Sequence, residues 1–298
     1  MLDNIKTIIY KLYFTLLHYL RGDFVLSSWI YPIKFSYTNN NFGDDINRPL
    51  IKGLTGKSVV IKHSTLLRNC ENLLCIGSIV EGFTDKDSII WGSGAINGLK
   101  PLLSKPRKVC AVRGPLTRAY LISQGVECPQ IYGDPALLFP LIYIPRMNKK
   151  YKLGIVAHYV DYDLPHVKEF REHNPHVKFI KLRGYESWKA VIDDICSCEM
   201  IASSSLHGLI FSDAYKIPNV RVSFSSGIEG GDFKYRDYYG GVNRPYVEPL
   251  LFCENIDVEQ IDMAVALYKP IVYDTAELLR AFPYKLKNKL KNYLITQK

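Results

Sequence analysis

MIASSSLHGLIFSDAY, residues 200–215, is the stretch that decides the fold. Its apolar start, Met200–Ser203, predicts a buried strand, and the apolar spacing over Leu206–Tyr215 predicts a helix. Strands that alternate with helices are typical of a parallel sheet covered on both faces. Ligands of such sheets bind where strands end and helices begin. The stretch therefore predicts an α/β fold and directs the search for a site to the ends of strands.

The same alternation continues through the rest of the chain. Before this stretch, strands are predicted at Ile30–Tyr37, Ser58–Lys62, Asn72–Ile76, Ser88–Trp91, Lys108–Arg113 and Gln130–Tyr132, with helices at Ile46–Leu54 and Leu116–Gln124. Around it, strands are predicted at Lys152–Tyr159, Val177–Leu182 and Asn219–Val222, with helices at Pro165–Glu172 and Trp188–Cys196. The polar segment Arg146–Lys150 is the candidate linker. We expect two facing, doubly wound Rossmann-like domains, residues 1–147 and 148–262, with a cleft between them. A C-terminal helical segment, residues 263–298, is expected to pack back on the first domain.

Composition excludes several classes of protein. The chain has 298 residues, a hydrophobic fraction of 47% and a formal net charge of +9, which is typical of a globular protein and excludes disordered and fibrous chains. The seven cysteines form no Cys-x-x-Cys pair, and Cys196-Ser-Cys198 has no second pair to complete a zinc site. We expect buried, reduced thiols, a cytoplasmic protein and no metal.

Both ends of the sequence have amphipathic patterns. The segment Ile5–Leu20 is interrupted by Lys6, Lys11 and His18 and is too short to span a bilayer, so we expect an amphipathic helix there. From Arg280 to Lys298 there are six basic residues and no acidic one. Such a tail either docks on anionic lipid, at about 1 kcal/mol for each Lys or Arg, or packs on its own domain. Nucleic acid is not expected, since basic and aromatic residues do not alternate as in known binding modules.

The first strand-end candidates are rich in glycine. Asn41-Phe42-Gly43-Asp44 precedes a predicted helix, where it is either an ordinary cap or a turn that binds an anion through backbone N–H groups. Gly92-Ser93-Gly94 is a second turn at a strand end. It lacks the Gly-x-Gly-x-x-Gly pattern, so it predicts no dinucleotide site.

Arg113 is the next candidate, because it ends a strand and precedes a helix that starts at Pro115. A guanidinium beside a helix N-terminus opposes the positive end of that helix, and a bound phosphate or carboxylate would explain its presence. The alternative is an internal ion pair with Asp134.

Ser203, Ser204, Ser205 and His207 lie at the turn of the quoted stretch, where hydroxyl groups and helix N–H groups would hold a phosphate. His207 would exchange a proton beside it, since histidine changes charge nearest to neutral pH. Further along, Gly230–Gly240 carries aromatic and charged residues between glycines. It is interpreted as a mobile loop that binds a sugar or closes over the cleft, or as a plain solvated loop.

Together and in order, these segments resemble the polysaccharide pyruvyl transferase family, most closely the branch that acts on exopolysaccharide or capsule repeat units. The matching stretches are Asn41-Phe42-Gly43-Asp44, Gly92-Ser93-Gly94, Val112–Arg118, Gly133–Ala136, Ser204–Ile210 and Lys234–Tyr238. The resemblance implies a fold similar to that of the B-type glycosyltransferases. It also implies that phosphoenolpyruvate and a sugar diol give a cyclic pyruvate ketal and phosphate, with phosphoenolpyruvate as co-substrate and no further cofactor.

The resemblance also implies roles for the site residues. His207 would be the general acid that protonates the methylene carbon of phosphoenolpyruvate, and Arg113 would bind its phosphate or carboxylate. The donor side would further contain Ser203, Ser204, Ser205, Asn41, Gly43 and Lys234, and the acceptor side Asp44, Gly92, Ser93, Tyr235 and Arg236. Many family members have an arginine where this chain has Ser205, so Lys234 or Arg236 would replace it, or the donor would be held differently.

The expected acceptor is a glycan, and a lipid-linked repeat unit would fit a protein that touches the inner face of the membrane through its terminal helices. Two other functions stay open from the sequence. One is a nucleotide-sugar-dependent glycosyltransferase of the same architecture, which would bind a nucleoside diphosphate. The other is a non-catalytic scaffold that binds sugar or membrane and does not depend on His207.

Overall fold

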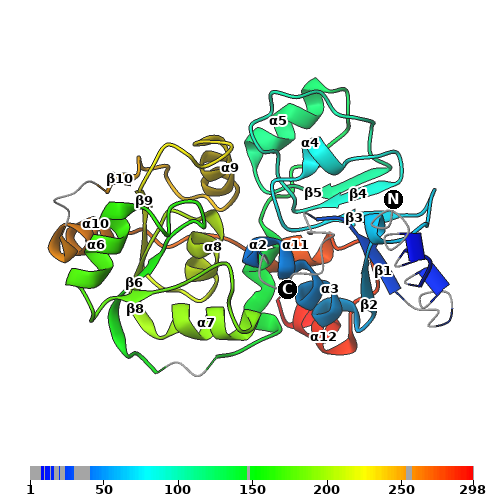
Figure 1. Cartoon of the computed structure of the whole chain (residues 1–298). Coiled ribbons are helices and arrows are strands. Elements are labelled where there is room, and N and C mark those ends of the chain that lie inside the picture. The colour runs from blue at the N-terminus through cyan, green and yellow to red at the C-terminus, as the bar shows by residue number, and fades with distance from the viewer. Residues whose placement is uncertain are drawn as a thin grey trace.

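Two parallel sheets organise the molecule. The structure is a computed structural model, and it describes residues 8–9, 11–13, 15–16, 20, 24–29, 41–145, 148–252 and 257–297. Among the described residues, each sheet has five strands, and all neighbouring strands run parallel. Figure 1 shows the sheets in two halves of the molecule, each with helices around it. The α/β fold predicted from the alternation of strands and helices is confirmed.

The first sheet has the strand order β2-β1-β3-β4-β5. Its strands are β1 (Phe24–Ser27), β2 (Ser58–Ile61), β3 (Asn72–Leu74), β4 (Ser88–Trp91) and β5 (Lys108–Ala111). The helices that follow its strands are α2 (Phe42–Asp45), α3 (Asn47–Thr55), α4 (Val80–Phe83) and α5 (Pro115–Ser123), with 3-10 turns η2 (Lys62–Ser64) and η3 (Pro135–Leu141).

The second sheet has the order β10-β9-β8-β6-β7. Its strands are β6 (Tyr151–Val156), β7 (Lys178–Phe179), β8 (Cys198–Ser203), β9 (Asn219–Ser223) and β10 (Leu250–Leu251). Its helices are α6 (Pro165–His173), α7 (Trp188–Cys196), α8 (Leu206–Ala214), α9 (Phe233–Gly241) and α10 (Val258–Ala266). The strand and helix of the stretch 200–215 are therefore β8 and α8, in the middle of this sheet.

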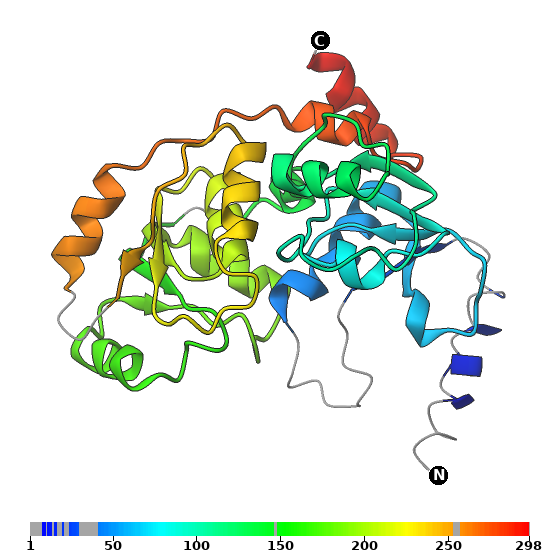
Figure 2. The same ribbon diagram turned by 90° about the horizontal axis from the view of Figure 1, so that it is seen from above.

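The chain then returns to the first sheet. Helices α11 (Thr275–Arg280) and α12 (Asn288–Thr296) lie beside it, with α12 next to α3 (Figures 1 and 2). The indole N–H of Trp91 donates to the carbonyl of Leu278 at 2.9 Å, and the Lys287 N–H donates to the carbonyl of Leu54 at 2.9 Å. The last helices therefore complete the packing around strands from the start of the chain.

Local sequence signals set several element ends. Gly56, at φ +81°, ends α3 in the left-handed conformation that glycine adopts without strain. Pro115 occupies the first turn of α5, where a missing N–H costs no hydrogen bond. Ser187 caps α7 by accepting the Ala190 N–H, and Asp257 forms a capping box with Gln260 at α10.

One hydrophobic cluster runs through both halves. Phe211 of α8 contacts Phe42 of α2 and Phe139 of η3, with ring centroids 4.9 and 5.0 Å apart. The same cluster contains Trp91 from the first sheet and Ile201 from the second. The sheets are therefore joined by a shared core and not only by the chain that connects them.

Several predictions about elements differ from the structure. Gln130–Tyr132 is not a strand, because only Tyr132 makes an isolated bridge, to Val112. Gly230–Gly240 is not a mobile loop, because most of it forms helix α9, which packs against α5 (Figures 1 and 2). Strands β1 and β10 were not predicted. The predicted strand Ile30–Tyr37 lies outside the described residues, as does half of the N-terminal helix predicted over Ile5–Leu20, whose described residues are helical.

Six cysteines in the described ranges are free thiols, and all of them except Cys70 are buried, as expected for reduced cysteines. Cys253 lies outside the described residues. No helix in the described part of the chain is long and apolar enough to cross a bilayer.

Candidate functional site

His207 lies in the first turn of α8, directly after the carboxyl end of β8. Its imidazole ring rests on Gly43 of α2, where a Cβ atom would come within 2.3 Å of the ring. The side chain is partly exposed, yet its Nε2 atom is buried and has no hydrogen-bond partner among the described residues. A buried ring nitrogen without a partner is costly, and it is the kind of group that a ligand satisfies.

The serines before His207 hold the turn together. Ser203 Oγ donates to the carbonyl oxygens of Val156 and Ser205 and accepts the Ser205 N–H. Ser204 Oγ donates to the carboxylate of Asp161 at 2.8 Å and accepts the His158 N–H at 2.9 Å. These hydroxyl groups thus fix the path of the backbone that presents His207.

Helix α2 approaches the same turn from the first half of the chain. The Phe42 N–H donates to the carbonyl of Leu182, which follows β7, at 3.0 Å. The Asn41 side chain donates to the Asp44 carboxylate at 2.7 Å, so this carboxylate is held within the turn. Tyr185 donates to Asp45, whose pKa is raised because the carboxyl group is buried. Loops from both sheets therefore meet at His207.

The basic groups around His207 repel one another. Burial lowers the pKa of His207 to about 3, and the charges of Lys234, Arg113 and His158 contribute to the decrease. Burial also lowers the pKa of His158 to about 4, together with the charges of Lys234 and Arg183. The pKa of Lys234 falls to about 8, chiefly through burial and then through Arg113 and Arg221. A bound anion would relieve this repulsion and raise all three pKa values.

Arg113 is an interior residue with a protein partner on each nitrogen of its guanidinium group. Its Nε pairs with the Asp237 carboxylate at 3.0 Å, one terminal nitrogen donates to Ser78, and the other donates to the carbonyl of Ala95 at 2.7 Å. Arg113 therefore forms its ion pair with Asp237. The alternative predicted from the sequence, an ion pair with Asp134, is wrong. Asp134 caps η3 instead, and burial raises its pKa to about 6.

The turn at Gly92-Ser93-Gly94 lies next to Arg113. A Cβ atom on Gly94 would come within 2.2 Å of the guanidinium carbon, so the close approach requires glycine there. Ser93 is fully buried and donates to the carbonyl of Gly77 at 2.8 Å. Gly92 and Ser93 thus shape the surroundings of Arg113, and the acceptor role predicted for them stays a prediction.

The three site residues predicted in helix α9, Lys234, Tyr235 and Arg236, have different surroundings. Lys234 is buried and its Nζ donates to the carbonyl of Glu229 at 3.0 Å. Tyr235 is also buried, and its hydroxyl supports the serine turn by donating to the Ser204 carbonyl at 2.7 Å. Arg236 is directed outward and pairs with exposed Glu248 at 3.2 Å. Of the three, Lys234 is the one that acts electrostatically on His207.

The sequence analysis missed two basic residues of this cluster, His158 and Arg183. Both follow observed strands, since His158 lies just after β6 and Arg183 lies after β7. The predicted strand Lys152–Tyr159 hid His158, because it was drawn longer than β6. Arg183 directly follows the predicted strand Val177–Leu182, so the rule that directed the search to strand ends would have found it.

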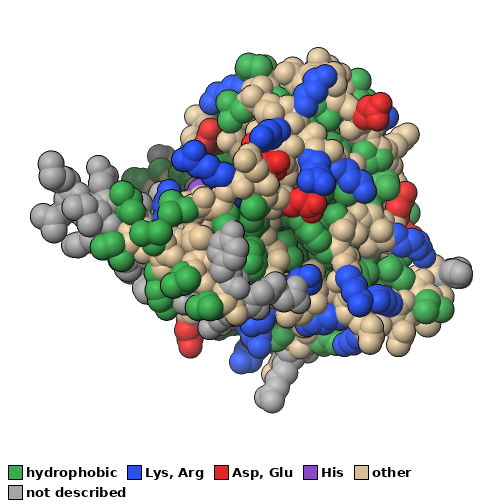
Figure 3. Space-filling model, turned by 90° about the vertical axis from the view of Figure 1, so that its right-hand side faces the viewer, with side chains coloured by type: hydrophobic (Ala, Val, Ile, Leu, Met, Phe, Trp, Pro, Cys, Tyr) green, Lys and Arg blue, Asp and Glu red, His purple; other side chains and the backbone are tan. Residues whose placement is uncertain are grey.

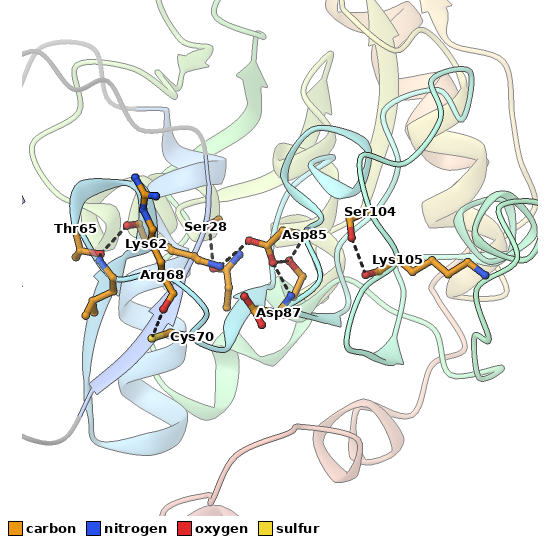
Figure 4. Close-up of polar contacts among 12 residues, drawn as sticks. Ser28, Lys62, Thr65, Arg68, Cys70, Asp85, Asp87, Ser104 and Lys105 are labelled. Carbon is orange, nitrogen blue, oxygen red and sulfur yellow. Dashed lines mark hydrogen bonds and ion pairs between the residues drawn. The ribbon is translucent and has the colours of Figure 1, made fainter.

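Two hollows of the described surface contain cations that already have carboxylate partners. A crevice of about 580 Å³ lies beside η2, and Figure 4 shows Lys62 directed toward Asp85, a pair 2.6 Å apart. A hollow of about 420 Å³ near α10 is lined by apolar groups and by Arg244, which pairs with Asp213. Lys234, His158 and Arg183, in contrast, form no ion pair with the described residues. Among the described residues, no three His, Cys, Asp or Glu side chains are placed to hold a metal ion.

The chain is similar to one protein family and to several known proteins. A family model described as polysaccharide pyruvyl transferase matches residues 2–226. The succinoglycan biosynthesis protein ExoV of Rhizobium meliloti is 30% identical over 213 residues, which cover 70% of this chain and 63% of that protein. A protein of Acanthamoeba polyphaga mimivirus without assigned function is 26% identical over 85% of this chain and 93% of its own length. A crystal structure of a functionally uncharacterised Klebsiella pneumoniae protein aligns with a TM-score of 0.44 and 14% identity, over 80% of this chain and 98% of that one.

Proposed function

The chain belongs to the polysaccharide pyruvyl transferase family, and on this premise we propose that its donor is phosphoenolpyruvate. In this proposal the enzyme forms a cyclic ketal between pyruvate and two hydroxyl groups of a sugar, and it releases phosphate. The acceptor is a repeat unit of a bacterial exopolysaccharide or capsule. The observation that carries the proposal is the unpaired imidazole nitrogen of His207 among Lys234, His158 and Arg183, which form no ion pair with a carboxylate of the described residues.

The reaction needs one acid placed beside an anion. Phosphoenolpyruvate carries a carboxylate and a phosphate, so the cluster of Lys234, Arg113, His158 and Arg183 would attract it. Binding would raise the pKa of His207 and favour the imidazolium form. His207 then delivers its proton to the methylene carbon, which becomes a methyl group. The neighbouring carbon becomes an electrophile.

The remaining steps close the ring. One sugar hydroxyl attacks the electrophilic carbon, the bond from that carbon to the phosphate oxygen breaks, and the second hydroxyl forms the ketal. Of the two hydroxyl protons, one restores His207 and the other leaves with phosphate. General acid catalysis contributes about 10²–10⁴-fold, so binding and orientation must supply much of the rest. Phosphoenolpyruvate is a co-substrate in this scheme, which calls for no further cofactor.

We also propose that the two sheets are the cores of facing Rossmann-like domains of the B-type glycosyltransferase kind, residues 1–147 and 148–262, with the donor in a cleft between them. The contact between His207 and Gly43 supports this, because it joins residues from the two halves of the chain. The donor side would contain Asn41, Gly43, Lys234 and the serine turn, and Asp44 with Arg236 would lie toward the acceptor.

A lipid-linked acceptor would bring the enzyme to a membrane surface. Exposed apolar side chains of the N-terminal segment support such a contact; they are those of Ile8, Ile9, Leu12, Leu16 and Leu20. On the face shown in Figure 3, hydrophobic side chains gather at the left edge, and Lys and Arg side chains are spread over its upper and lower parts. Helix α12 supports it less, because Leu290 is buried in the shared core and Ile295 is the one large apolar side chain of this helix that is strongly exposed.

Phosphate release tests the proposal. The protein would be incubated with phosphoenolpyruvate and a panel of β-galactoside, glucoside and N-acetylmannosaminide acceptors. We expect acceptor-dependent phosphate release and a product that gains the mass of pyruvate less water. His207→Gln should abolish turnover, whereas His173→Gln, a change at an exposed histidine of α6, should not. Stabilisation by a nucleotide sugar and not by phosphoenolpyruvate would instead indicate a glycosyltransferase.

A further inference from the structure

We propose that Arg183 and His158, together with Lys234, bind the phosphate group of the donor. This assignment rests on the proposed function and adds two residues, Arg183 and His158, that lie outside the family-like motifs of this chain. It places the direct phosphate contact on the loops after β6 and β7. Arg113, whose guanidinium already has three protein partners, then contributes its charge from the interior.

The position of Arg183 is fixed by its neighbours. The carbonyl of the preceding residue, Leu182, accepts the Phe42 N–H, so Arg183 stands beside the start of α2 and close to the Gly43–His207 contact. Its guanidinium carbon lies 3.4 Å from the centre of the Tyr159 ring. Stacking on the ring occupies one face of the guanidinium and leaves its N–H edge for planar contact with an oxyanion.

Arg183 lacks the carboxylate partner that three arginines of the interior have. Arg113, Arg221 and Arg244 pair with Asp237, Asp232 and Asp213. Arg171 also has a buried guanidinium nitrogen without a partner among the described residues, but its charge does not act on His207 or His158. Within the described ranges, Arg183 has no ion pair or hydrogen bond, and its Nε atom is buried without a partner. A buried guanidinium nitrogen without an acceptor is unfavourable, and a phosphate oxygen would satisfy it.

His158 belongs to the same surface. Its ring lies 4.3 Å from the ring of Tyr159, on which Arg183 stacks, and its backbone N–H donates to Ser204 in the turn before His207. The lowered pKa of His158 agrees with this placement, because burial and the charges of Lys234 and Arg183 cause it. The carboxylates of Glu229 and Asp161 act on Lys234 and raise its pKa. Burial and the neighbouring cations lower this pKa by more, so it falls overall.

A phosphate fits these donors better than a carboxylate does. The guanidinium of Arg183, the ammonium of Lys234 and the imidazole of His158 belong to three elements, and in our proposal a phosphate offers three oxygens and up to two negative charges to them. The carboxylate and the methylene carbon of the donor would then extend toward His207. Phosphate would also remain a ligand after the transfer, so the site predicts product inhibition by inorganic phosphate.

The test uses the whole protein and two small probes, inorganic phosphate and pyruvate. We expect millimolar phosphate to raise the melting temperature of the wild-type protein more than pyruvate does. Arg183→Gln should weaken phosphate binding by about tenfold or more and raise the KM for phosphoenolpyruvate more than it lowers kcat. Arg183→Lys should recover part of the affinity, because it keeps the charge but loses the planar fork.

Arg171→Gln is the matched control, because Arg171 stacks 4.9 Å from the ring centre of Tyr162 and its charge is not among those that lower the pKa of His207 or His158. It should leave phosphate binding unchanged. His158→Gln provides a second variant if Arg183→Gln does not fold. Wild-type affinity for phosphate in folded Arg183→Gln or His158→Gln, or no phosphate binding by the wild-type protein, would overturn the assignment. If phosphate binding depends on Arg183 but phosphoenolpyruvate is never turned over, the phosphate site stands and the proposed function is wrong.

Discussion

At the scale of single residues, His207 couples catalysis to stability. Its pKa in the folded protein falls from the ordinary value of 6.5 to about 3, so the native state keeps the ring neutral in mild acid. The unfolded chain takes up a proton on this ring below about pH 6.5, and the native state does not. The contribution of His207 to the free energy of unfolding therefore becomes more unfavourable as the pH falls from about 6.5 toward 3.

We predict that His207→Gln makes the protein less sensitive to acid. On lowering the pH from about 7.5 to about 5, the wild-type protein should lose more free energy of unfolding than the variant, by on the order of 1 kcal/mol after allowance for the partial exposure of the ring. Urea unfolding at both pH values measures this difference. His173→Gln serves as the control, and equal losses in wild type and His207→Gln would contradict the pKa assigned to the ring.

Gly43→Ala tests the contact between α2 and the histidine. A Cβ atom would come within 2.3 Å of the ring, so either the ring or the helix must move. We expect a loss of about 1–3 kcal/mol in the free energy of unfolding and a lower kcat. Gly82→Ala in α4 is the matched control, because a Cβ there meets nothing within 4 Å and should be neutral or slightly stabilising. Full activity in Gly43→Ala would show that the position of the ring is not critical.

The sequence identified part of the candidate site. His207, Gly43 and Lys234 were predictable because each lies at a strand end or in a motif, and the structure brings them together. The partner of Arg113 was not, since Asp237 lies 124 residues further along the chain. The sequence also could not predict that Arg183 lacks a carboxylate partner, because this depends on which carboxylates the fold places near it.

At the scale of elements, helix α9 is the segment that was predicted as a loop. Glycines at both ends suggested mobility, and the low amphipathicity of the segment gave no helical pattern. Tertiary contacts decide the outcome, because the Asp237 carboxylate accepts hydrogen bonds from Arg113 and from the backbone and hydroxyl of Thr117 at 2.6–3.0 Å. Gly114 permits this approach, since a Cβ there would lie 1.8 Å from the Asp237 carbonyl oxygen.

Asp237→Asn should be strongly destabilising. It leaves the buried Arg113 charge without its counter-ion, and the loss of one partner from a buried ion pair costs about 3–5 kcal/mol. The change is measured by urea unfolding. Glu248→Gln breaks the exposed pair with Arg236 on the same helix and should cost about 1 kcal/mol or less. Similar effects of the two substitutions would mean that α9 does not depend on the buried pair.

At the scale of the whole molecule, the alternation of strands and helices was enough to predict the α/β class. It was not enough to predict the extent of the core. The ring of Phe211 touches Phe42 and Phe139, which precede the predicted linker, so one hydrophobic cluster serves both sheets. Such contacts join residues distant in the sequence, and periodicity carries no information about them.

We predict that the protein unfolds in a single cooperative transition. Calorimetry should give equal calorimetric and van't Hoff enthalpies, because each sheet loses its share of the common cluster around Phe211 when the other unfolds. Phe211→Ala should lower the free energy of unfolding by about 3–5 kcal/mol and begin to separate the transition into two. Two well-resolved transitions in the wild-type protein would show that the halves are independently stable.

The return of α11 and α12 to the first sheet also bears on the order in which the chain folds during synthesis. Trp91 emerges from the ribosome long before Leu278, the residue whose carbonyl its indole N–H requires, and before Leu290, which the same core buries. The half of the protein that is made first is thus the half that is completed last. Until the final helices appear, its apolar surface stays open to solvent and to chaperones.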